Sequence, residues 1–102
     1  MNEKLDKKPP LYITFFIQEN GLSFGWGLNR NQIYPRLPIC TKDTLDLWVS
    51  RGRTTEEIAH TEALKYFNGS LSADLNIPAG YPYEFFIQGE EASRFSGTLR
   101  QP

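Results

Sequence analysis

The sequence is poor in the residues that build disulfides, metal sites and most acid–base centres. Its 102 residues include one cysteine, Cys40, and one histidine, His60. A single cysteine excludes an internal disulfide and a four-cysteine zinc site. Such sparse cysteine usage is typical of a reducing compartment, so we expect a cytoplasmic protein.

A strong net charge and a long apolar run are also missing. The 11 basic and 12 acidic residues give a formal net charge of −1. This balance provides no global attraction to nucleic acid or to an anionic membrane, so nucleic acid is a disfavoured partner. No run approaches the roughly 20 apolar residues that span a bilayer, and we therefore expect no membrane partner.

What the sequence does contain is enough apolar surface for a core. Hydrophobic residues make up 39% of the chain and aromatic residues 14%. Residues 1–10 are mostly charged or polar and end in two prolines, so we expect a flexible N-terminal tail. Residues 11–102 are then predicted to form one domain.

The most informative local pattern is a hairpin signal in residues 11–28. Two runs of alternating apolar and polar residues flank Asn20-Gly21. Asn-Gly is the usual centre of a two-residue hairpin turn, because both residues accept positive φ. A turn at that position predicts a register in which Ile17 faces Phe24.

The middle of the chain carries two helical patterns. Thr41 is the predicted N-cap of the first helix, and Gly52 is placed to end it. Thr54 and Glu57 have the spacing of a capping box for the second helix, which is predicted to end at Asn68-Gly69.

The segment before the helices, residues 29–40, is predicted to be an irregular connection. Pro35 and Pro38 exclude a central strand, although Ile33-Tyr34 or Ile39-Cys40 fits an edge strand. After the helices, the alternation of apolar and polar residues predicts three strands. They cover residues 71–77, 83–88 and 94–99.

These elements predict an α+β fold with a single antiparallel β-sheet of about five strands in the order ββααβββ. Two helices pack on one face of that sheet. The expected core consists of Ile13, Phe15, Ile17, Leu22, Phe24, Trp26, Trp48, Val49, Ile58, Phe67, Leu71, Leu75, Ile77, Phe85, Ile87 and Phe95.

Catalytic chemistry finds little support in the sequence. No motif sets a nucleophile beside His60, which we interpret as a surface side chain, and Cys40 is interpreted as a small buried one. The acidic pairs Glu56-Glu57 and Glu90-Glu91 are neighbours in sequence and do not form a facing dyad. We therefore predict no enzyme activity, no catalytic residue, no metal site and no cofactor.

Two short segments resemble known families. Residues 45–59, with Gly52, Thr54 and Glu57-Ile58-Ala59, resemble the first helices of the LuxR-type helix-turn-helix. That resemblance implies DNA binding, but a strand is predicted where the recognition helix should follow. Residues 71–88 resemble a strand–turn–strand unit of starch-binding modules, in which a Pro-Ala-Gly turn precedes an aromatic-rich strand. This second resemblance implies hairpin geometry, without the family's tryptophan platform.

The predicted sheet has a second face that the helices leave uncovered. The aromatic side chains expected on that face are Tyr12, Phe16, Tyr83 and Phe86. Two acidic residues, Glu90 and Glu91, lie in the neighbouring predicted loop and complete the expected protein-binding site. Exposed aromatic groups of this kind mark interaction surfaces. We therefore expect a non-catalytic protein-binding module, such as an inhibitor, immunity or accessory protein of a bacterium or mobile element.

Alternatives to that function remain open at this level. A second copy of the chain in a homodimer, or the segment 31–40, would also cover the aromatic face. A small ligand-binding domain, with carbohydrate as one ligand class, and a nucleic-acid-binding domain are the alternative functions.

Overall fold

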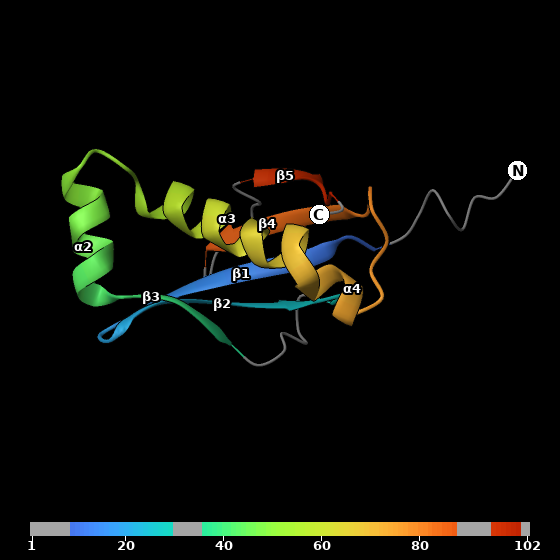
Figure 1. Cartoon of the computed structure of the whole chain (residues 1–102), viewed down its shortest axis with the longest axis horizontal. Coiled ribbons are helices and arrows are strands. Elements are labelled where there is room, and N and C mark those ends of the chain that lie inside the picture. The colour runs from blue at the N-terminus through green and yellow to red at the C-terminus, as the bar shows by residue number, and fades with distance from the viewer. Residues whose placement is uncertain (1–8, 30–35, 88–94, 101–102) are drawn as a thin grey trace, which may run out of the picture.

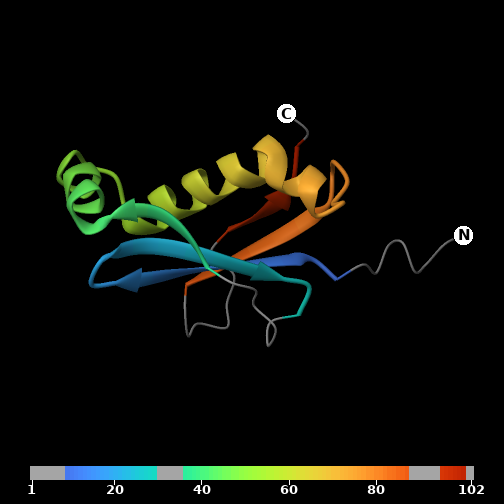
Figure 2. The ribbon, with the colours of Figure 1, turned by 60° about the horizontal axis from the view of Figure 1, so that its bottom comes forward.

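The computed structural model describes residues 9–29, 36–87 and 95–100 and has an α+β architecture (Figure 1). Five strands form one sheet in the order β3-β2-β1-β4-β5. The strands are β1 (Leu11–Gln18), β2 (Gly21–Gly27), β3 (Leu37–Thr41), β4 (Pro82–Ile87) and β5 (Phe95–Thr98). The helical elements are α2 (Lys42–Ser50), α3 (Thr55–Tyr66), η1 (Phe67–Leu71) and α4 (Ser72–Asp74). Figure 2 shows α3 and α4 running over one face of the sheet.

The sheet is mixed, so the prediction of a purely antiparallel sheet is wrong. Strand β1 pairs antiparallel with β2 but parallel with β4. The predicted order ββααβββ is also wrong, because β3 precedes the helices and residues 71–77 are not a strand. A parallel pair needs a crossover connection, and the helical segment provides it by passing over one face between β3 and β4.

The β1–β2 hairpin is confirmed, but its register differs from the prediction by two residues. Ile17 faces Leu22 instead of Phe24, and the turn residues are Glu19 and Asn20. Gly21 belongs to the strand and has φ +145°. A Cβ atom there would overlap the backbone of Cys40 in β3, so the glycine serves strand packing instead of the turn. A shift of two keeps each side chain on its expected face.

Strand β3 (Leu37–Thr41) confirms the predicted edge strand at Ile39-Cys40, whereas the alternative at Ile33-Tyr34 lies outside the described residues. It pairs with β2 from Gly21 to Phe24, with an irregularity between Leu22 and Ser23. Pro38 lies in β3, where an edge position accommodates the missing N–H.

Both predicted helix starts are confirmed. The Thr41 hydroxyl accepts the Thr44 backbone N–H at 3.3 Å, and the Thr54 hydroxyl accepts the Glu57 N–H at 3.2 Å. Gly52 follows α2 with φ +94°, as expected for a glycine that ends a helix.

The segment predicted as a strand, residues 71–77, is helical in its first part. The chain does not end its helix at Asn68-Gly69 but bends at Gly69, which has the non-helical values φ −87° and ψ −112°. The Ser72 hydroxyl donates to the Phe67 carbonyl at 2.5 Å across this bend. The alternation of apolar and polar residues in 71–77, which predicted a strand, instead belongs to a short helix and the turn that follows it.

That short helix ends in a Schellman turn. The Ile77 N–H donates to the Ser72 carbonyl at 2.8 Å, and the Asn76 N–H donates to the Ala73 carbonyl at 3.1 Å. Asn76 has φ +58°. Asparagine tolerates this left-handed conformation better than most residues, which explains its place there.

The core lies between the sheet and the helices. Of the predicted core, Ile13, Phe15, Leu22, Phe24, Ile58, Phe67 and Phe85 are buried. Three other predictions are wrong, because Ile17, Val49 and Leu75 are 53%, 42% and 39% exposed. The remaining members pack partly buried against the core: Trp26, Trp48, Leu71, Ile77, Ile87 and Phe95.

Candidate functional site

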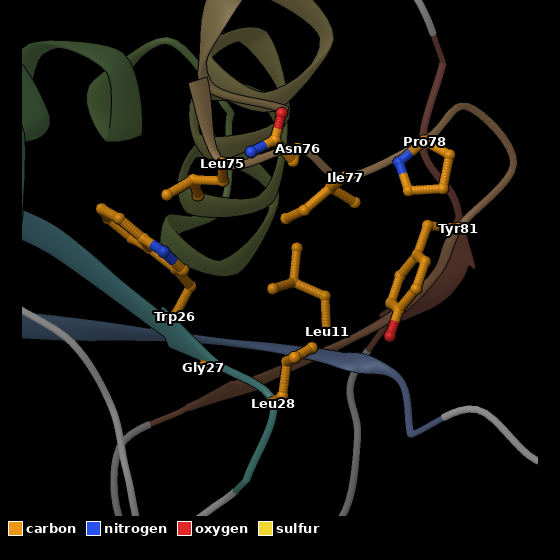
Figure 3. Close-up of a pocket in the computed structure, with 9 residues that line it drawn as sticks. All are labelled: Leu11, Trp26, Gly27, Leu28, Leu75, Asn76, Ile77, Pro78 and Tyr81. Atoms are coloured by element: carbon orange, nitrogen blue, oxygen red, sulfur yellow. The ribbon is translucent and has the colours of Figure 1, made fainter. Parts of the chain in front are cut away.

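An apolar groove lies at the end of the sheet where β2 finishes (Figure 3). Its volume is about 420 Å³. Three separate segments line it: Leu11 from β1; Trp26, Gly27 and Leu28 from the end of β2; and Leu75, Asn76, Ile77, Pro78 and Tyr81 from the connection between α4 and β4. In Figure 3 the side chains of Leu11, Leu75 and Ile77 point toward the space between Trp26 and Tyr81.

Local structure fixes the walls of this groove. The Schellman turn at Asn76 reverses the chain after α4 and so places Leu75 and Ile77 opposite Leu11. On the other wall, the Tyr81 hydroxyl donates to the Pro9 carbonyl at 2.8 Å. The Tyr81 hydroxyl therefore already donates its hydrogen bond within the chain.

The chemistry of the groove is apolar and neutral. None of the described side chains that line it carries a charge. Leu28 and Leu75 are 52% and 39% exposed, so apolar surface continues from the groove onto the rim. Asn76, which is also exposed, adds an amide at that rim. Such a surface suits an apolar group of a partner or ligand and offers no general acid or base.

The aromatic face expected from the sequence is not open to solvent. Phe16 and Phe86 are only 7% and 4% exposed, and Tyr12 is half-buried, so the prediction that this face exposes its rings is wrong. The Phe86 ring lies 5.8 Å from that of Tyr12, and the Arg36 guanidinium lies 3.7 Å from the Phe16 ring centroid. Neighbouring side chains thus satisfy these rings within the chain.

Tyr83 lies on the opposite face from the one predicted. Alternation along β4 puts Tyr83 and Phe85 on one face and Phe86 on the other. Tyr83 belongs to the core below α3 and is 6% exposed. The remaining predicted site residues, Glu90 and Glu91, lie outside the residues that the structure describes.

His60 forms an aromatic cluster with Tyr83 and Phe95. Its Nε2 atom lies 2.8 Å from the Tyr83 hydroxyl, and its ring stacks on Phe95 with centroids 4.3 Å apart. His60 is thus half-buried, not a surface side chain. Burial lowers the pKa of His60 below 6.5. Burial also raises the pKa of Tyr83, while Arg100 acts in the opposite direction. The cluster joins α3 to β4 and β5, and its polar contact is with a phenol, not with a nucleophile.

This cluster predicts a pH-dependent stability. The unfolded chain takes up a proton on His60 near pH 6.5, whereas the folded chain resists it because its pKa is lowered. Stability is therefore full above pH 6.5 and falls as the pH drops below it. His60→Gln keeps a hydrogen-bonding side chain but does not titrate, so its loss of stability from pH 7 to pH 5 is expected to be smaller. Urea unfolding of both proteins at the two pH values measures this difference, and equal losses would contradict the assignment.

Cys40 is not activated as a nucleophile. Burial raises the pKa of its thiol, the nearby Glu62 carboxylate raises it further, and a backbone hydrogen bond with Leu22 opposes them. The thiol therefore stays protonated at neutral pH. His60 places its Nε2 beside the Tyr83 hydroxyl, and among the described residues no hydrogen bond joins His60 to Cys40.

Two features are absent from residues 9–29, 36–87 and 95–100. In these ranges no three side chains of His, Cys, Asp or Glu come together as a metal site would require. In the same part of the chain, no helix has the length and apolar composition needed to cross a bilayer.

Comparison with protein-family models, curated proteins and solved structures finds no match for this chain. Sequence reasoning missed the groove because its walls come from segments that are far apart in the chain. The exposed Leu28, just after a strand, was the one local signal of apolar surface at that end of the sheet.

Proposed function

We propose that this chain is a non-catalytic protein-binding module of inhibitor, immunity or accessory type, and that its groove contacts the partner. The observation that carries the proposal is the neutral apolar groove, whose rim residues Leu28 and Leu75 remain 52% and 39% exposed. Exposed apolar surface around a concavity is typical of protein interaction sites. Within residues 9–29, 36–87 and 95–100, His60 contacts a phenol and the Cys40 thiol is protonated, which favours binding over catalysis.

The test uses one charge at the rim and one matched control. Leu75→Asp places a carboxylate in the groove, whereas Leu47→Asp changes a 48% exposed leucine on α2, at the opposite end of the sheet (Figure 1). We expect wild type and Leu47→Asp to capture one stoichiometric protein from extracts of the source cells. Leu75→Asp should bind that protein at least tenfold more weakly, which is about 1.4 kcal/mol. The measurement is affinity capture with mass spectrometry, followed by titration calorimetry.

Two results would contradict this proposal. One is a captured partner whose affinity for Leu75→Asp equals that for wild type. The other is an equal loss in Leu47→Asp, which would indicate nonspecific apolar adhesion. Sedimentation of the purified chain separately identifies a homodimer, because a dimer formed through the groove should dissociate in Leu75→Asp.

A second candidate function is binding of a small apolar ligand. The volume of about 420 Å³ falls within the range of small-molecule sites, and Trp26 and Tyr81 flank it. The scarcity of polar groups favours an apolar ligand over a carbohydrate, which would need many hydrogen bonds. Native mass spectrometry of chain purified from its source cells distinguishes the two functions by the mass of what stays bound.

A further inference from the structure

One wall of the groove is a strap that connects the helical layer to the sheet. The strap, residues 69–80, runs from η1 through α4 toward β4 and contributes Leu75, Asn76, Ile77 and Pro78 to the lining. In Figure 3 these residues form the side of the groove that faces Leu11. The position of the strap therefore sets the width of the groove.

Both ends of the strap are anchored to the segment that follows β5. At the first end, the Arg100 N–H donates to the side-chain oxygen of Asn68 at 2.9 Å. At the second end, the Gly80 N–H donates to the Leu99 carbonyl at 2.7 Å, and the Leu99 N–H donates to the Tyr81 carbonyl at 2.9 Å. Leu99 is itself buried in the core, so these anchors are fixed to the body of the domain.

Between its anchors the strap has few contacts that hold it in place. Among the described residues, no hydrogen bond joins residues 70–79 to a strand. Within the strap only Ser72 is buried, whereas Leu71 and Ile77 are partly buried against the core. A segment with so little buried apolar surface opens locally at a low free energy.

A glycine stands at each end of the strap. Gly69 interrupts the helical path with φ −87° and ψ −112°, and Gly80 has φ +80°. No described atom from elsewhere in the chain lies within 4 Å of the position that a Cβ would take at either glycine. Close packing therefore does not explain these two glycines. Residues that absorb changes of φ and ψ at the ends of a moving segment are typical hinges.

One hydrogen bond spans the first of these hinges. The Ser72 hydroxyl, inside the strap, donates to the Phe67 carbonyl, before Gly69, at 2.5 Å. This bond, which we call the latch, ties the strap to the fully buried Phe67. Breaking the latch would leave the strap attached at its two ends alone.

From these observations we propose that the strap is a hinged wall, which swings about Gly69 and Gly80 and is held closed by the latch. The swing itself is a property of the free chain. Its role rests on the proposed function, because a movable wall lets the groove admit a partner side chain or ligand larger than its volume of about 420 Å³.

The test is NMR relaxation dispersion on the free full-length chain, which detects a minor conformation that exchanges in microseconds to milliseconds. The amides of Leu75 and Ile77 report the strap, and the indole N–H of Trp26 reports the groove. The amides of Leu99 and Arg100 report the anchors. We expect one exchange rate and one minor population to fit the strap and the indole, and flat profiles at the anchors.

Two serine variants then test the latch. Ser72→Ala removes it, and Ser70→Ala, which removes an exposed hydroxyl from the same strap, is the matched control. A hydrogen bond within a protein shifts a two-state equilibrium by about three- to tenfold. We therefore expect the minor population to rise by about that factor in Ser72→Ala, and by less than about twofold in Ser70→Ala. The anchor profiles should stay flat in both variants.

Three results would overturn the hinged wall. The first is a flat profile of the strap in both wild type and Ser72→Ala, and the second is an exchange rate of the strap that differs from that of the Trp26 indole. The third is exchange of the anchors together with the strap, which would indicate loss of local structure instead of a swing.

The hinged wall and the proposed function fail in different ways. If the strap does not exchange but Leu75→Asp weakens the captured partner, the wall is rigid and the binding module stands. If the strap exchanges as expected but no captured protein depends on Leu75, the proposed function is wrong and the swing has no role in binding.

Discussion

Replacing Phe67 with alanine is expected to lower the free energy of unfolding by about 3–5 kcal/mol. Phe67 is fully buried where α3 passes into η1. Its ring lies 6.0 Å from that of Phe24 and 5.8 Å from that of Trp26, both at edge-on angles. The alanine variant loses these contacts and leaves a cavity under the helical layer. Urea unfolding followed by circular dichroism measures the loss.

The loss of the Phe67 ring should also change the groove, because the Trp26 ring that lines the groove packs against Phe67. Domains of this size are stable by about 5–15 kcal/mol, so a loss of about 3–5 kcal/mol removes a large share of the total stability. Phe67→Leu retains most of the volume and serves as the graded control, with an expected cost of less than half as much. A loss below about 1 kcal/mol for Phe67→Ala would show that this residue does not anchor the helices.

Gly21→Ala is expected to cost about 2–4 kcal/mol. The backbone at Gly21 has φ +145°, and a methyl group there would meet the Cys40 carbonyl in β3. The variant must therefore separate β2 from β3 or change the backbone conformation. We expect a lower midpoint of urea unfolding and faster amide exchange in β3.

Gly52→Ala is the matched control for this glycine. Gly52 also has a positive φ, +94°, but no atom lies within 4 Å of the position that its Cβ would take. Its substitution carries only the conformational cost, about 1–2 kcal/mol. If Gly21→Ala cost no more than Gly52→Ala, the close approach of β3 would not be what requires glycine at position 21.

Signals that act over a few residues predicted the local structure well. Thr41 and Thr54 accept the N–H three residues ahead as their spacing predicts, and the β1–β2 hairpin forms. The predicted register was wrong because Asn20-Gly21 has the composition of a turn centre. Glycine is required at position 21 for another reason, since a Cβ atom there would overlap the Cys40 backbone in β3. The overlap involves a residue of another strand, so turn propensity, which depends only on neighbouring residues, could not predict it.

Tertiary context decided the features that the sequence did not predict. Residues 71–77 alternate like a strand, but the bend at Gly69 and the left-handed Asn76 make a short helix and its cap. The parallel pairing of β1 with β4 joins distant segments, and no local pattern encodes it. The aromatic face failed as an exposed site because Phe16 and Phe86 find partners within the chain.

The parallel pair also bears on how the protein is made. Leu11 in β1 pairs with Tyr83 in β4, which follows it only after β2, β3 and all the helices. The middle of the sheet cannot close on the ribosome until β4 has emerged from the exit tunnel. Until then the apolar strand β1 has β2 on one side and an open edge on the other, a period in which aggregation competes with folding.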